Sequence, residues 1–250
     1  MAEFNLLQSF PKVKRGLIGR VVTPETLKIS RKQGFDYYDG NRNYGFGGYV
    51  YDGRWRAVAE LAKRRYALTA KSQVLVERCE KAFLVFDIKK LIPGITVFGS
   101  HCFEYALTHA MDGYGRWALI NGKEKSKDPK LIEQQARDEV SPFLIKAELN
   151  DSFLFKDNFF DTVISINSIC NYPEAECRNA LREIMRVSKN KGENCYIHTD
   201  SWTNAQEKEA LMKWVLLCKT FLDTKSWERL YQEEGYRGDW GFTIFGGDNF

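Results

Sequence analysis

Helical periodicity alternates with short apolar runs along most of the chain. One helix face is predicted by apolar residues at three- and four-residue spacing, namely Trp55, Val58, Ala59, Ala62 and Tyr66. Five β-like runs follow, at 73–76, 95–99, 143–147, 162–166 and 195–199. Strands that alternate with helices predict a parallel sheet with helices on both faces.

Two further helices and a last strand are expected in the second half. The first helix has Ala180, Leu181, Ile184 and Met185 on one face, with Pro173 before it and Gly192 after it. The second has an apolar face that runs from Ala210 to Leu222, and Asn204 and Glu207 precede it in an arrangement similar to a capping box. Residues 235–245 read as a final strand, antiparallel at a sheet edge.

Two segments lack this alternation of predicted helices and strands. Residues 1–53 are irregular and form a predicted cap segment before a domain at 54–250, and residues 111–130 form an exposed insertion. Residues 37–53 place aromatic side chains between glycines, asparagines and aspartates. Either this stretch covers a site or contacts a partner, or its tyrosines shield the core. The contact residues under the first interpretation are Tyr37, Tyr38, Tyr44, Phe46, Tyr49 and Tyr51.

Composition narrows the class of protein. The chain has 250 residues, 44% of them hydrophobic and 28% charged, which suits one α/β domain with an elaboration. The net charge of +4 is small for a nucleic-acid binder, and the basic clusters at 63–65 and 123–130 read as solvated faces. No apolar run is long enough for a membrane span, and no signal peptide is visible. We expect a cytoplasmic protein.

Cysteine and histidine spacing argues against a metal site. The six cysteines contain no C-x-x-C pair, and the three histidines contain no H-x-x-x-H pair. Reduced, buried thiols are the expected state.

Three blocks of sequence carry a family resemblance. They are VLVERCEKAFLVFDIKKLIPGITVFGSHCFEYALTHA, KDNFFDTVISINSICNYPEAECRNALREIMRVSKNKG and DSWTNAQEKEALMKWVLLCKTFL, the last followed by SWERLYQEEGY. In order and spacing the region from about Tyr37 to Phe245 resembles the class I S-adenosylmethionine-dependent methyltransferases. The resemblance implies a Rossmann-like fold.

The same resemblance implies a cofactor site that is altered in this chain. The family's first-strand acidic residue falls on Val76, its three loop glycines on Arg78, Glu80 and Ala82, and its ribose-binding carboxylate on His101. Glycine permits a left-handed backbone and a close approach of the cofactor, and the carboxylate accepts ribose hydrogen bonds. All five changes reduce affinity for the cofactor, so we expect these to be degenerate positions and no cofactor to bind.

Two more positions are candidates for the reaction site. Cys170 stands where similar small methyltransferases often have a histidine base, and we interpret it as a buried thiol rather than a nucleophile. Asp200 follows a predicted fifth strand, where it is a relic of a site or a helix cap.

Two functional hypotheses follow from the resemblance. The first is a pseudoenzyme that stabilises or activates an active methyltransferase paralogue as a heterodimer, or forms a homodimer. The second is an active methyltransferase in which Arg78 moves aside and His101 binds the ribose, with transfer to an oxygen or nitrogen of a small molecule such as a sugar or secondary metabolite. Neither hypothesis involves nucleic acid or membrane.

Overall fold

The computed structural model describes residues 2–10, 20–149 and 154–245. Its centre is a six-stranded sheet in the order β3-β2-β1-β4-β5-β6, with every neighbouring pair parallel. This is the order of a doubly wound Rossmann-like sheet. The strands are β1 Gln73–Glu77, β2 Thr96–His101, β3 Leu144–Lys146, β4 Thr162–Ile166, β5 Tyr196–Ser201 and β6 Asp239–Ile244.

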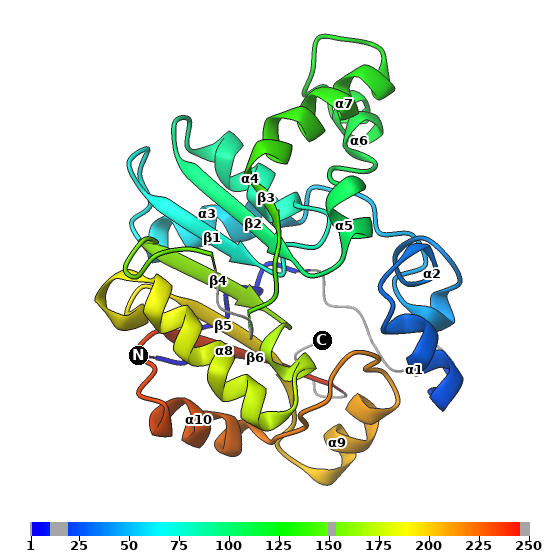
Figure 1. Cartoon of the computed structure of the whole chain (residues 1–250). Coiled ribbons are helices and arrows are strands. Elements are labelled where there is room, and N and C mark those ends of the chain that lie inside the picture. Colours follow the sequence, from blue (N-terminus) through cyan, green and yellow to red (C-terminus); the bar gives the residue numbers. More distant parts are fainter. Residues whose placement is uncertain (1, 11–19, 150–153, 246–250) are drawn as a thin grey trace.

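Helices cover both faces of the sheet and extend beyond it (Figure 1). The α-helices are α1 Pro24–Ser30, α2 Phe35–Tyr38, α3 Trp55–Arg65, α4 Phe83–Leu91, α5 Glu104–Thr108, α6 Tyr114–Ile120, α7 Pro129–Val140, α8 Glu174–Val187, α9 Ala205–Met212 and α10 Thr224–Glu233. Four short 3-10 helices complete the set: η1 Arg42–Tyr44, η2 Ser141–Phe143, η3 Ile169–Asn171 and η4 Lys189–Gly192.

The two-residue alternation of strand side chains divides the core into two clusters. Val74 and Val76 of β1 face the cluster that includes α3 and α4, and Leu75 faces the cluster that includes α8 and α10. Such alternation is what a strand buried on both faces requires. The predicted parallel sheet with two helical layers is therefore confirmed.

The last strand corrects one prediction. β6 runs parallel to β5, with Tyr196 opposite Asp239 and Ser201 opposite Ile244. Parallel neighbours need a crossover that returns the chain to the same end of the sheet, and the segment that contains α9 and α10 provides it. No antiparallel edge strand occurs in the described residues, and Glu3 instead bridges to Trp240 in parallel.

Three helix expectations also change. α9 ends at Met212, so the apolar residues from Trp214 to Leu222 lie in a loop rather than on a helix face. The cap segment, expected to be irregular, contains α1, α2 and η1. The insertion at 111–130 contains α6, which packs against α7 and projects with it away from the sheet (Figure 1). Among the described helices, none has the length and apolar composition to cross a bilayer.

Candidate functional site

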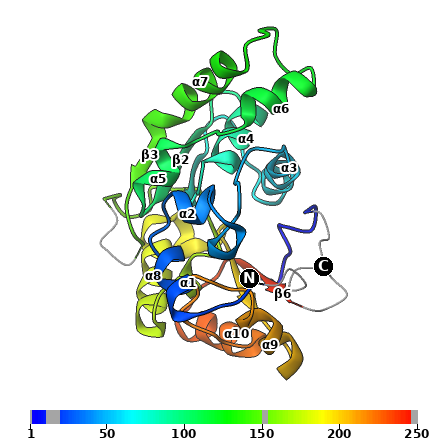
Figure 2. The same ribbon diagram turned by 90° about the vertical axis from the view of Figure 1, so that its right-hand side faces the viewer.

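The carboxyl ends of the strands meet the cap segment. Tyr37 and Tyr38 of α2 form a small apolar cluster with Ala106 of α5, and Tyr105 packs against it. Figure 2 shows α2 lying next to α5, in agreement with this cluster. In doubly wound folds, ligands bind outside the carboxyl ends of the strands, where the strand order reverses between β1 and β4. The candidate site is therefore this edge together with the cap above it.

Glu77 is the acidic residue at the end of β1. Its side chain is buried, and its two carboxylate oxygens accept hydrogen bonds of 2.8 Å from the hydroxyls of Ser165 and Ser168. Burial raises the pKa of Glu77 above its usual value, although the two serine hydroxyls oppose this shift. Glu77 follows Val76, the position to which the resemblance assigns the acidic residue, and the Val76 side chain lies in the core.

The loop after β1 has a left-handed backbone at three non-glycine residues. Arg78, Glu80 and Ala82 have φ angles of 53°, 53° and 63°. These are the positions to which the resemblance assigned glycines. A left-handed conformation costs an L-residue about 1 to 2 kcal/mol relative to glycine. The loop thus has the backbone that glycine favours and the side chains of other residues.

The Arg78 side chain is buried under the cap. Its Nη2 donates to Oε1 of Gln33 at 2.6 Å, its Nη1 lies 3.8 Å from Sγ of Cys102, and its Nε lies 3.8 Å from Oε1 of Glu80. Only 6% of Arg78 is exposed. The guanidinium therefore links the β1 loop to the segment between α1 and α2.

Glu80, Tyr38 and His101 form the centre of a buried polar network. The Tyr38 hydroxyl donates to Oε2 of Glu80 and lies 3.2 Å from Nε2 of His101, which is 3.5 Å from the same carboxylate oxygen. Although burial opposes ionisation, His101, Arg78 and the Tyr38 hydroxyl hold the pKa of Glu80 below its usual value. His101 is the last residue of β2 and only 1% exposed.

Lys81 fixes the same loop from its other side. Its Nζ is fully buried and binds both carboxylate oxygens of Asp39, at 2.9 and 2.8 Å, and Oδ2 of Asp112 at 2.8 Å. Asp39 belongs to the cap, and Asp112 is also bound by Arg137 of α7 at 2.9 Å. This ammonium group joins the cap, the β1 loop and the projecting helices.

Sequence reasoning missed four members of this site: Gln33, Asp39, Glu77 and Lys81. Glu77 could have been found, since an acidic residue at the end of an apolar strand is itself a signal. Gln33 and Asp39 lie 45 and 42 residues from their partners, Arg78 and Lys81. Because such pairings depend on tertiary contacts, local patterns carry no sign of them.

The two reaction-site candidates lie at neighbouring strands. Cys170 is buried in η3 after β4, and its thiol contacts Oδ1 of Asn171 at 3.9 Å and also Cys218. Asp200 lies within β5, opposite Thr243, rather than after the strand as expected. All six cysteines are free thiols, and no group of three metal-binding side chains occurs among the described residues.

The cap aromatics fall into two groups. Tyr37, Tyr38 and Tyr51 are buried, whereas Tyr44, Phe46 and Tyr49 are half-buried. Tyr38 stacks with Phe46 at a centroid distance of 5.8 Å and with Tyr105 at 5.7 Å. The buried Tyr38 also belongs to the candidate site, through its hydroxyl beside Glu80 and His101.

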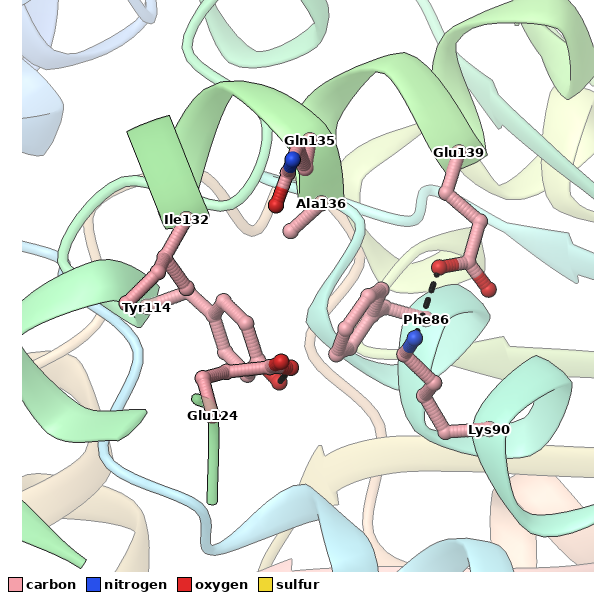
Figure 3. Close-up of a pocket in the computed structure, with 8 residues that line it drawn as sticks. All are labelled: Phe86, Lys90, Tyr114, Glu124, Ile132, Gln135, Ala136 and Glu139. Atoms are coloured by element: carbon pink, nitrogen blue, oxygen red, sulfur yellow. Dashed lines mark hydrogen bonds and ion pairs between the residues drawn. The ribbon is translucent and has the colours of Figure 1, made fainter. Parts of the chain in front are cut away.

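Two cavities lie away from this edge. One, of about 100 Å³, lies between α4, α6 and α7, where Figure 3 shows the residues that line it: Phe86, Lys90, Tyr114, Glu124, Ile132, Gln135, Ala136 and Glu139. The other lies near the end of α4 and is lined by Lys89, Lys90, Pro93, Gly94, Ile95 and Glu139. Neither includes a residue of the β1 loop or of the cap.

A comparison with protein families matches part of the chain. Residues 120–195 match the family described as "Methyltransferase domain". The match begins at the last residue of α6 and ends just before β5, so it includes β3, β4 and α8. It covers less than a third of the chain. No curated protein matches the chain.

Several solved structures are similar to this chain at low sequence identity. A candidate methyltransferase in complex with the Haloferax volcanii Trm112 methyltransferase activator is 15% identical, over 86% of this chain and 77% of that one, with a TM-score of 0.47. YcgJ from Bacillus subtilis is 14% identical, over 70% and 66%, with a TM-score of 0.46. A candidate methyltransferase from Bacillus halodurans C-125 is 16% identical, over 71% and 68%, with a TM-score of 0.45.

Proposed function

We propose that this protein, a member of the methyltransferase family by its central segment, does not bind S-adenosylmethionine and acts as a non-catalytic partner of an active methyltransferase. The observation that carries the proposal is the β1 loop. Arg78 and Glu80 have left-handed backbones and direct their side chains into a buried network with Gln33, Tyr38 and His101.

The chemistry of this network opposes cofactor binding. A methyl donor at this edge would need backbone exposed at the loop and an acceptor for its ribose hydroxyls. His101 has both ring nitrogens close to partners, with Nδ1 3.1 Å from the backbone N–H of Phe103 and Nε2 facing Tyr38 and Glu80. Displacing Tyr38 would leave the Glu80 carboxylate without one of its donors, which carries a free-energy cost.

Titration calorimetry with S-adenosylmethionine tests the loss of binding. We expect no heat from the wild-type protein and recovered binding in a variant that carries Arg78→Gly, Glu80→Gly, Ala82→Gly and His101→Asp. Ala67→Gly is a matched control, because Ala67 also has a positive φ, 50°, but lies away from the edge. A low-micromolar isotherm from the wild type would refute the proposal.

The partner role has its own test. Copurification from the native cell followed by mass spectrometry should recover a second methyltransferase-fold protein in stoichiometric amount. Adding purified wild-type protein to that enzyme should raise its methyl-transfer rate. If the wild-type protein runs as a monomer with no such companion and no effect on rate, the partner role is wrong.

One observation favours a second candidate, an active small-molecule methyltransferase. The side chains that fill the edge are held by the cap, through Gln33 and Tyr38, and the left-handed loop already has the conformation that glycines would adopt. Movement of the cap would release Arg78 and Glu80 together. A methyl-transfer assay on sugar and secondary-metabolite acceptors, with radiolabelled donor, distinguishes this candidate from the first.

A further inference from the structure

Two arginines of the cap converge on one tryptophan. The guanidinium carbon of Arg20 lies 4.6 Å from the centroid of the Trp214 ring, and that of Arg42 lies 5.4 Å from it. Arg20 also donates from Nη1 to the Trp214 carbonyl at 2.9 Å. Trp214 lies in the loop after α9, so these contacts join the cap to the carboxyl-terminal part of the domain.

Both guanidinium groups share one carbonyl oxygen. Nη2 of Arg20 donates to the Gly45 oxygen at 2.6 Å, and Nη1 of Arg42 donates to the same oxygen at 3.0 Å. Only glycine fits at position 45, because a Cβ there would lie 1.9 Å from the carbonyl oxygen of Tyr37. The turn therefore positions two cationic groups side by side.

The positive charge of this pair has no acidic counterpart among the described residues. Every hydrogen bond that Arg20 and Arg42 donate there goes to a backbone carbonyl, from Trp214, Arg42, Gly45 or Phe46. No carboxylate in that part of the chain lies within ion-pair distance of either group. Nε of Arg20 is buried and has no acceptor.

Burial and the proximity of the two guanidinium groups both lower the pKa of Arg20. Burial, and then the charge of Arg42, lowers the pKa of Arg20, and burial lowers the pKa of Arg42. Adjacent guanidinium groups without an acid repel each other, and an anion between them would remove that repulsion. Planar guanidinium groups also match the geometry of phosphate oxygens.

We propose that Arg20, Arg42 and Trp214 form a binding site for a phosphate group, as the free dianion or as the phosphate monoester of a small molecule. The two guanidinium groups match its charge, the exposed Arg42 supplies donors at Nη2, which makes no hydrogen bond among the described residues, and the half-buried Trp214 ring forms an apolar wall beside it. The bound anion would hold the cap against the loop after α9. This site is separate from the β1 loop and does not depend on the function proposed above.

Calorimetry and intrinsic fluorescence with inorganic phosphate test the site in the absence of S-adenosylmethionine. At constant ionic strength we expect saturable binding of phosphate and quenching of Trp214, with little response to chloride or acetate. A phosphate monoester such as glucose 6-phosphate is a further arm, and tighter binding of the monoester than of free phosphate would identify the small-molecule source. The full chain is used throughout.

Variants separate the site from general charge effects. Arg42→Ala should weaken phosphate binding by about tenfold or more, because it removes one of two charged donors. Arg31→Ala, at an exposed arginine of the same cap, removes an equal charge and should change affinity by less than about twofold. Trp214→Phe should abolish the fluorescence change and retain the heat of binding. Equal affinities in wild type and Arg42→Ala, or equal binding of acetate, would overturn the proposal.

Discussion

The carboxylates of Glu80, which is half-buried, and Asp87, which is buried, have pKa values shifted in opposite directions. Glu80 in the β1 loop accepts a hydrogen bond from Tyr38, and Asp87 in α4 accepts one from Tyr51 at 2.6 Å. Both tyrosines belong to the aromatic stretch of the cap. Yet the pKa of Glu80 lies below its usual value, whereas the pKa of Asp87 is raised to about 7.

The difference comes from the groups that surround each carboxylate. Burial raises the pKa of both groups, but the His101 ring at 3.5 Å and the Arg78 guanidinium at 3.8 Å outweigh it at Glu80. At Asp87 the second oxygen is buried without any donor, and Asp52 adds a repulsive charge that opposes the attraction of Arg56. A tyrosine hydroxyl alone therefore does not keep a buried carboxylate ionised.

The comparison also shows that the cap is attached to the rest of the domain in two different ways. At the carboxyl edge, the cap is held by charge, through Gln33 on Arg78, Tyr38 on Glu80 and Asp39 on Lys81. At α4 it is held by one neutral hydrogen bond and by aromatic packing, with Tyr51 at 5.5 Å from Phe83 and 5.0 Å from Trp117. The two fastenings should respond differently to pH.

The largest expected effect is a pH-dependent loss of stability that arises from Asp87. An acid whose folded pKa is raised contributes stability below its unfolded pKa, and this contribution is lost as pH rises through the folded pKa. For a rise from 3.8 to about 7, the full loss amounts to about 4 kcal/mol and develops between these two pKa values. Asp87→Asn should remove this dependence, and urea denaturation at several pH values measures it.

The control for this prediction is Asp36→Asn. Asp36 is exposed at the start of α2, so its amide should leave the pH dependence unchanged. We expect Asp87→Asn to be less stable than the wild type at pH 5, where an amide N–H replaces an unbonded oxygen, and more stable at pH 8. Parallel pH curves for the wild type and Asp87→Asn would show that Asp87 ionises freely in the folded state.

Removing the buried ammonium group of Lys81 should have the next largest effect on stability. Lys81→Met would leave the carboxylates of Asp39 and Asp112 without the ammonium group that lies 2.8 Å from each. Breaking a buried ion pair in this way costs about 3 kcal/mol or more. Chemical denaturation measures the cost. Lys63→Met, at an exposed position of α3, is the matched control and should change stability by less than about 0.5 kcal/mol.

Glu80→Gln tests the charge itself. Because the folded pKa of Glu80 is lowered, its contribution is present above the unfolded pKa and is lost as pH falls through the folded pKa. We expect a loss of about 2 kcal/mol at pH 7, typical of hydrogen bonds to a charged group, which shrinks toward pH 3. Glu104→Gln, whose side chain is 72% exposed, should have little effect at either pH. A loss that does not depend on pH would mean that the Glu80 charge contributes nothing.

The sequence predicts the sheet better than it predicts the site. Short apolar runs and the final predicted strand located all six strands within a few residues, because burial of both faces leaves a local pattern. The direction of β6 could not be predicted, since a short strand has the same pattern in either direction and its crossover sets the direction. Likewise, α9 ends at Met212 and Trp214 lies against Arg20, a contact between distant segments.

The site was predictable only where backbone conformation follows from a motif. The resemblance assigned glycines to positions 78, 80 and 82, and all three residues have a left-handed backbone. What their side chains do was not predictable. Glu80 and Asp87 meet tyrosines that lie 42 and 36 residues away in the sequence, so only the folded chain determines which groups surround each carboxylate.

The smallest expected effect isolates the hydrogen bond to Asp87. Tyr51→Phe removes a hydrogen bond that lowers the pKa of Asp87, so this pKa should rise above about 7 and the decline in stability should extend to higher pH. The expected loss of stability at pH 5 is about 1 kcal/mol, since the bond is then between neutral groups. Tyr38→Phe is the counterpart at Glu80, and there the loss at pH 7 should be larger, because the acceptor is charged. If both variants lost the same stability at both pH values, the two carboxylates would share one ionisation state and the contrast between the two fastenings of the cap would be wrong.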